Sequence, residues 1–152
     1  MIKSEQDIFW MQQALDLARQ AAENNEVPVG AILIHENTVI GKGYNQPIAR
    51  KDPTAHAEIL ALRDAAGCIG NYRLVDTILY VTLEPCAMCI GALIQARIKK
   101  LVFGAYDPKA GAVESIFHLL DSEKLNHRIL YEGGILSASC GGLLSDFFRD
   151  KR

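Results

Sequence analysis

Two short segments of the chain combine residue types that can bind a metal ion and move protons. Cys86 and Cys89 follow Pro85 and lie one helical turn apart, so both thiols share a helix face and can bind one ion. The start of a helix also lowers a thiol pKa and favours the thiolate. His56 and Glu58 are two residues apart on an earlier predicted helix, and both can reach a site only beyond its N-terminal end.

Together these segments predict a catalytic zinc site. His56, Cys86 and Cys89 supply three protein ligands and leave the fourth position open, as catalytic zinc sites do. Zinc lowers the pKa of a water in that position towards ~7, and a carboxylate must then take and return protons. We expect about one zinc ion per chain. We expect Glu58 to be the general acid and base, in preference to Glu84.

Other interpretations of these residue types stay open. The Cys86 and Cys89 pair alone is also typical of a redox site, which would leave His56 and Glu58 unexplained. A zinc site closed by a fourth cysteine would be structural rather than catalytic. The remaining cysteines are expected to be small buried hydrophobic residues, and the remaining histidines to be structural or solvated. These residues are Cys68, Cys140, His35, His118 and His127.

Hydrophobic spacing predicts the elements that position these segments. The expected strands are residues 27–35, 39–44, 77–83, 100–105 and 129–131, and loops are expected over 45–53 and 107–112. The expected helices are residues 4–25, 54–66, a segment from 85, and short helices near 114–120 and 139–152. In the first helix Ile8 falls on the buried face, and Ser4 and Asp7 resemble a capping box. Thr54 is the expected cap of the second helix and Gly67 its stop.

The order of these elements predicts an α/β fold. We expect three α/β/α layers around a central mixed sheet, in which an antiparallel N-terminal hairpin joins parallel strands. Open α/β sheets bind ligands at the C-terminal edge of their central strands, so the site is expected there.

The composition excludes several classes of protein. Hydrophobic residues make up 49% and charged residues 22% of the 152 residues, which is typical of a globular chain. No apolar run approaches the ~20 residues of a membrane helix, and no signal peptide is visible. We expect a cytoplasmic protein with reduced thiols, no membrane association and a single domain over residues 1–152.

The two segments match a known signature. His-x-Glu followed by Pro-Cys-x-x-Cys marks the zinc-dependent nucleobase deaminases, a pattern defined on those enzymes themselves. Beyond it, nearly the whole chain resembles the bacterial tRNA-specific adenosine deaminases of the cytidine-deaminase superfamily. The resemblance extends over 27–31, 43–45, 52–58, 80–86, 103–105 and 143–149. The segments 126–128 and 145–149 resemble the tRNA branch in particular.

The resemblance implies hydrolytic deamination of adenosine to inosine at the wobble position of a tRNA anticodon. It also implies a cytidine-deaminase-like fold and a homodimer that binds the tRNA anticodon stem-loop. The implied roles are a bond to the target nucleotide from Asn45, a base pocket lined by Val27 and Pro28, and anticodon-loop contacts from Asp107, Lys109, Phe147, Phe148 and Arg149.

Competing interpretations of these residues and of the activity remain. Phe147 and Phe148 lie on an apolar helix face and could pack in the core, and Asn45 could be a turn residue. The same zinc chemistry also fits a deaminase of a free base or nucleotide, such as guanine, cytosine or deoxycytidylate. A non-catalytic RNA-binding or zinc-structural subunit is the alternative of a different class.

The net charge of −2 argues against general affinity for nucleic acids. A small cationic rim can still recognise an RNA loop by its shape. The residues expected to form such a rim are Lys109, Arg128, Arg149, Lys151 and Arg152.

Overall fold

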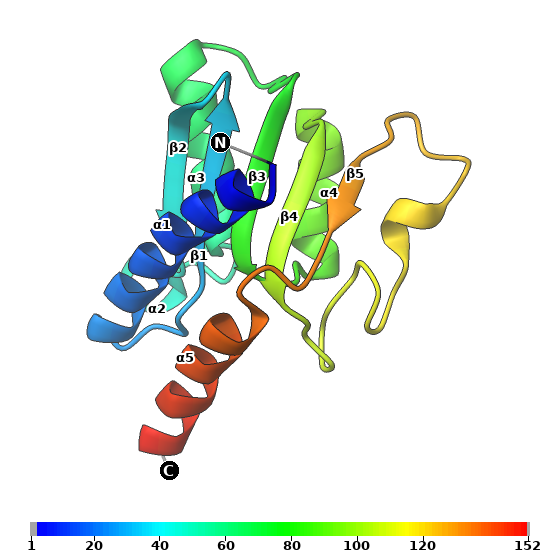
Figure 1. Cartoon of the computed structure of the whole chain (residues 1–152). Helices are drawn as coiled ribbons and strands as arrows, with labels where there is room; N and C mark the ends of the chain where they lie inside the picture. The colour runs from blue at the N-terminus through cyan, green and yellow to red at the C-terminus, as the bar shows by residue number, and fades with distance from the viewer. Residues whose placement is uncertain (1–2, 152) are drawn as a thin grey trace.

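The computed structural model describes residues 3–151 of the chain (Figure 1). In chain order the elements are α1 (Lys3–Glu23), β1 (Gly30–His35), β2 (Thr38–Tyr44), α2 (Pro47–Arg50), α3 (Ala57–Ile69), β3 (Thr77–Leu83), α4 (Ala87–Ala96), β4 (Lys100–Ala105), the 3-10 helix η1 (Leu119–Asp121), β5 (Leu130–Glu132) and α5 (Ser137–Asp150). Among the described residues, no helix is long and apolar enough to cross a membrane.

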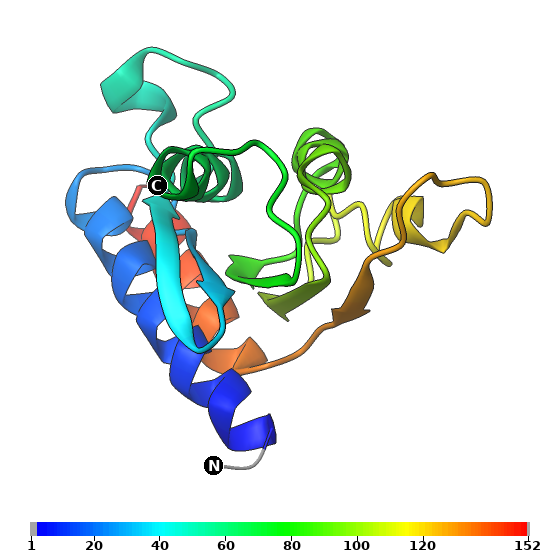
Figure 2. The ribbon, with the colours of Figure 1, turned by 90° about the horizontal axis from the view of Figure 1, so that it is seen from above.

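The sheet and its helices form the three layers that the sequence predicts. The strand order is β2-β1-β3-β4-β5. β1 is antiparallel to β2 and β3, whereas β3, β4 and β5 are parallel, so the sheet is mixed as expected. Helices α1 and α5 cover one face and α3 and α4 the other, with a hydrophobic core on each side (Figures 1 and 2). Helix α5 extends past the end of the sheet where β3 and β4 terminate.

The strands follow from local sequence. β3 and β4 have the predicted bounds, and β3 is covered on both faces because Leu79 and Val81 pack in one core and Tyr80 in the other. The hairpin turn is shorter than expected. Glu36 and Asn37 have φ of 49° and 62°, the positive values of a two-residue hairpin turn, so Thr38 already belongs to β2.

The bounds of α3 correct the sequence prediction. His56 is the N-cap residue rather than Thr54, because the Thr54 N–H and hydroxyl both bond to the Asp52 carboxylate, at 2.9 and 2.7 Å, and close a turn before the helix. The helix passes through Gly67 and ends at Ile69, and Gly70 is its C-cap, with a φ of 70° that suits glycine. The short helix α2 lies within the segment predicted to be a loop.

Helix α1 buries the predicted face at Met11, Leu15 and Ala18 but not at Ile8. Ile8 is exposed, whereas Asp7 is buried and accepts a hydrogen bond from the Tyr80 hydroxyl at 2.6 Å. Asp7 therefore faces the sheet and does not form a capping box, and the side chain of Ser4 lies outside the described residues. The prediction of a helix over 114–120 is also wrong, because only the short η1 forms in this region.

Candidate active site

Three potential metal ligands converge at the N-terminal ends of α3 and α4. The Nδ1 atom of His56 lies 3.7 Å from Sγ of Cys86 and 3.5 Å from Sγ of Cys89. The three ligand atoms all lie within 4.8 Å of one another. One imidazole nitrogen and two sulfurs are a donor set that suits zinc and leaves room for a further ligand. The residues fit a metal ion, as the sequence predicts.

Neighbouring residues fix the first turn of α3. His56 and Cys86 are the N-cap residues of α3 and α4. The Asn45 side-chain carbonyl accepts the Ala57 N–H at 2.8 Å. A side chain at Gly43 would collide with the Ala57 carbonyl oxygen, so glycine allows β2 to approach the helix closely. These contacts place Glu58, in the first turn of α3, beside the three ligands.

The electrostatics suit metal binding and proton transfer. The Cys89 thiol donates to Cys86 and, together with His56, lowers the pKa of Cys86 to about 3. The bond to Cys86 and burial raise the pKa of Cys89, and the bond to Cys86 also raises the pKa of His56. Burial raises the pKa of Glu58 to about 7. A carboxyl group with a pKa near neutrality can both take and return protons at the pH of a cell.

The other cysteines and histidines lie outside this group. Cys68 is exposed, which contradicts its predicted burial, because α3 continues past Gly67 and turns this position to solvent. Cys140 is buried as expected, and burial raises its pKa to about 11. Neither belongs to the metal-ligand group found among residues 3–151, so the structure does not support a zinc site closed by a fourth cysteine. His127 bonds to the Ile98 carbonyl oxygen at 2.6 Å, a structural contact.

A pocket of about 480 Å³ opens at the C-terminal ends of β3 and β4. It brings together Val27, Asp107, Lys109 and Phe148 from the predicted substrate-binding set. Phe148 is 47% exposed, so it is not a core residue. The Asp107 carboxylate is already engaged, since it accepts the N–H groups of Lys109 and Ala110 at 3.0 and 3.3 Å.

The remaining predicted substrate residues are not among those that line this pocket. Pro28 is buried, and Phe147 is half-buried beside Lys151, whose ammonium lies 5.3 Å from its ring. The exposed Arg149 pairs with Asp146 at 2.9 Å.

The predicted cationic rim does not gather as a whole. Arg128 lies with Lys99 and Leu130 near the starts of β4 and β5, whereas Lys109 lies beyond the C-terminal end of β4. Arg152 lies outside the described residues.

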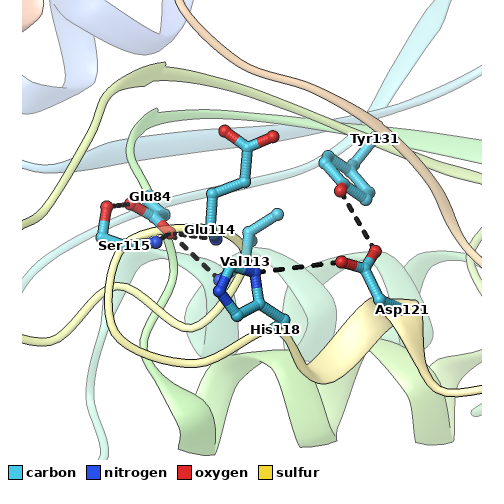
Figure 3. A network of polar contacts seen from close by, with 7 residues as sticks. All are labelled: Glu84, Val113, Glu114, Ser115, His118, Asp121 and Tyr131. Atoms are coloured by element: carbon cyan, nitrogen blue, oxygen red, sulfur yellow. Dashed lines mark hydrogen bonds and ion pairs between the residues drawn. The ribbon is translucent and has the colours of Figure 1, made fainter.

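Two buried glutamates, Glu84 and Glu26, make contacts that the sequence does not predict. The Glu84 carboxylate accepts hydrogen bonds from the loop after β4 (Figure 3). Glu26 accepts the N–H groups of Ile48 and Ala49 at 3.2 and 2.8 Å, at the start of α2. In the sequence, each glutamate precedes an apolar residue beside a predicted strand or turn, and this position was the available signal that its side chain is buried. Their partners are distant in sequence, so the contacts themselves could not be foreseen.

Known proteins resemble the chain over nearly its whole length. The sequence profile of the MafB19-like deaminase family matches residues 5–152. A tRNA-specific adenosine deaminase of Haemophilus influenzae is 50% identical over 99% of this chain and 88% of the relative, and one of Bacillus subtilis is 42% identical over 97% and 91%.

Solved structures resemble it as well. A structure from a study of A-to-I editing by tRNA:A34 deaminases has a TM-score of 0.86 and 41% identity, covering 90% of this chain and 99% of that one. A guanine deaminase from Nitrosomonas europaea has a TM-score of 0.76 and 25% identity over 91% and 82%. Because the similarity in sequence extends over almost the full length of both curated relatives, this chain belongs to the family of tRNA-specific adenosine deaminases.

Proposed function

We propose that the protein hydrolyses adenosine to inosine at the wobble position of a tRNA anticodon. One observation carries the proposal: a His-Cys-Cys group sits beside a buried glutamate in a chain 50% identical to a tRNA-specific adenosine deaminase. His56, Cys86 and Cys89 would hold zinc, and Glu58 would be the general acid and base. The cytoplasm, where tRNA is processed in bacteria, is the inferred compartment.

The chemistry divides between the metal and Glu58. When bound, zinc acts as a Lewis acid that makes water nucleophilic at neutral pH. Glu58 takes a proton from the attacking water and delivers it to N1 of adenine as the C6–O bond forms. Glu58 then takes the remaining proton from the new C6 hydroxyl and passes it to the amino group. The C6–N bond breaks, ammonia leaves, and the C6 carbonyl of inosine remains. The near-neutral pKa of Glu58 suits both transfers.

Asn45 would orient the target nucleotide. Its side-chain carbonyl accepts the Ala57 N–H, which fixes the orientation of the amide and leaves the NH2 group to meet a substrate. Such a group donates only, and it would select an acceptor atom on the nucleotide. Val27 and Pro28 would line the base pocket.

The 480 Å³ pocket supports contact with an unpaired loop. The exposed ring of Phe148 offers a surface on which a base can stack, and Lys109 offers a cation for a phosphate. Asp107, Phe147 and Arg149 would contribute around them. Asp146 offsets the charge of Arg149, whereas Lys151 keeps its charge while it bonds to Asn25 at 2.9 Å. Lys109 is the one cation among the described residues that line the pocket. Recognition would therefore depend mainly on loop shape.

A homodimer is part of the proposal. Met88, Ile116 and Phe117 are exposed apolar side chains on α4 and on the loop after β4. Apolar surface of this kind is typical of a face that a second subunit covers.

The test compares substrates on the zinc-loaded protein. We expect inosine to form in an anticodon stem-loop with adenosine at the wobble position, and no turnover of free guanine, cytosine or deoxycytidylate. The guanine arm matters because a guanine deaminase shares the fold. Faster turnover of any free base than of the stem-loop would overturn the proposal. The same assay across the transfer RNAs of a bacterium would identify the natural substrate.

A further inference from the structure

We propose that Glu84 is a positioning residue that holds the substrate-facing loop after β4 in its binding shape. We name residues 107–115 the Glu84-anchored loop. The inference rests on the proposed function, because it concerns how this loop meets the stem-loop substrate. Glu84 is 1% exposed and is not part of the metal-ligand group of the described residues. It therefore acts through the loop and not on the reacting atoms.

One carboxylate binds both ends of the loop. Oε1 accepts the Asp107 N–H at 3.0 Å and a short hydrogen bond from the Ser115 hydroxyl. Oε2 accepts the N–H groups of Val113, Glu114 and Ser115 at 3.0, 2.8 and 3.0 Å. Figure 3 shows Ser115, Val113 and Glu114 converging on Glu84. A carboxylate offers acceptors only, so it matches a set of donors.

The neighbouring backbone repeats this connection. The Ala112 N–H donates to the Pro85 carbonyl oxygen at 2.8 Å, and the Glu84 N–H donates to the Ala105 carbonyl oxygen at 2.8 Å. A side chain at Gly111 would collide with the Glu84 carboxylate, so the loop needs glycine where it passes. The segment that carries the metal ligand Cys86 therefore also fixes the shape of the loop.

The loop in turn places substrate-facing groups. Asp107 receives its backbone constraint from Glu84 and accepts the Lys109 N–H with its own carboxylate. Both residues line the pocket that also contains Phe148. A loop released from Glu84 would leave these groups without fixed positions. Substrate binding would then have to order the loop, and the lost conformational entropy would lower the affinity. Substrate binding should weaken while the chemistry at the metal continues.

The first experiment uses the zinc-loaded Glu84→Gln protein and an anticodon stem-loop. Glutamine keeps the size of the side chain but turns an NH2 group toward backbone N–H donors. We expect KM to rise about tenfold, kcat to stay within about twofold, and about one zinc ion per chain to remain. Hydrogen exchange at the amides of Asp107, Val113, Glu114 and Ser115 should accelerate. A residue that only stabilised the fold would lower zinc content and kcat together and would leave KM unchanged.

Further variants keep the test decisive if Glu84→Gln does not fold. Ser115→Ala removes one donor and keeps the backbone bonds, so KM should rise by about threefold. Gly111→Ala should push against the carboxylate and reproduce the larger effect. Glu123→Gln is the control, since Glu123 is an exposed glutamate outside the Glu84-anchored loop and receives the same change of side chain. It should leave KM and amide exchange unchanged.

The outcomes separate this inference from the proposed function. If the wild type does not deaminate the stem-loop, the proposed function is wrong, and so is the claim that the loop binds this substrate. Amide exchange still measures whether Glu84 holds the loop. If the wild type is active but Glu84→Gln and Gly111→Ala leave KM within about twofold, only the inference is overturned. Unchanged amide exchange in both variants would overturn it as well.

Discussion

The Nδ1 atom of His56 lies 3.5 Å from the Sγ atom of Cys89, although 33 residues separate them in the chain. They meet because α3 and α4 pack on the same face of the sheet and begin at the same end. A metal ion bound there would cross-link the two helix starts. Metal binding should therefore contribute to folding stability as well as to activity.

Zinc affinity should rise with pH. Cys86 has a pKa of about 3 and is already a thiolate at neutral pH, whereas Cys89 has a raised pKa and must lose its proton when zinc binds. Lower pH therefore favours the metal-free form, and the apparent Kd should fall about tenfold per pH unit for each proton released. Competition with a chelator between about pH 6 and 8 measures this slope. A Kd independent of pH would contradict the assignment of Cys89 as a ligand.

Replacing Glu58 should separate metal binding from turnover. Glu58→Gln keeps the shape of the side chain and removes its ability to accept and return a proton, so kcat should fall by roughly 10²–10⁴-fold. Zinc content and stem-loop affinity should stay near the wild-type values, which metal analysis and binding titration check. Retained turnover would exclude Glu58 as the general acid and base. Loss of zinc would instead make Glu58 a support of the metal site.

The sequence predicts the centre of the sheet better than its surroundings. β3 and β4 have the predicted bounds because apolar residues on both faces are a strong local signal. The metal-ligand residues come together as expected because the His-x-Glu and Pro-Cys-x-x-Cys segments are each recognisable by local residue type and spacing, even where the exact helix start is not.

The regions that sequence could not predict depend on tertiary contacts. The loop over 107–115 is held by hydrogen bonds to Glu84, and no local sequence pattern predicts a partner so distant in the chain. The start of α3 was misplaced because Asp52 engages Thr54 in a turn and leaves the N-cap position to His56. The two phenylalanines of α5 share one apolar pattern but have different surroundings, which only the packing of α5 reveals.

Asn45→Asp should impair substrate recognition without damaging α3. Aspartate keeps the acceptor that bonds the Ala57 N–H and loses the NH2 donor proposed for the nucleotide. We expect kcat/KM for the stem-loop to fall by roughly 10- to 100-fold, with the melting temperature preserved. Asn45→Ala loses both functions and should lower the melting temperature too. If Asn45→Asp were as active as wild type, Asn45 would be a turn and capping residue only.

Tyr80→Phe should destabilise the protein in a way that depends on pH. The Tyr80 hydroxyl donates to Asp7 between α1 and the sheet, and its loss leaves a buried carboxylate without this donor, at a cost of about 1–3 kcal/mol near pH 7. Burial, and then the bond to Asp7, raise the pKa of Tyr80 above its usual 10, so the folded state retains a proton that the unfolded chain releases above that pH. The contribution of Tyr80 to the stability of the wild type is therefore fully present below pH 10 and declines above it. The Tyr80→Phe variant has no ionisable group at this position, so its stability shows no such decline.

The stability gap between wild type and Tyr80→Phe should consequently narrow as pH rises above 10, and denaturant unfolding at neutral and alkaline pH measures it. Tyr131→Phe is the matched control, because the Tyr131 hydroxyl donates to the exposed Asp121 at 3.1 Å. That variant should stay within about 0.5 kcal/mol of wild type near pH 7. A gap for Tyr80→Phe that stayed constant or widened at alkaline pH would mean that Tyr80 ionises as readily in the folded protein as in the unfolded chain. The buried bond to Asp7 would then not hold the Tyr80 hydroxyl in its protonated form.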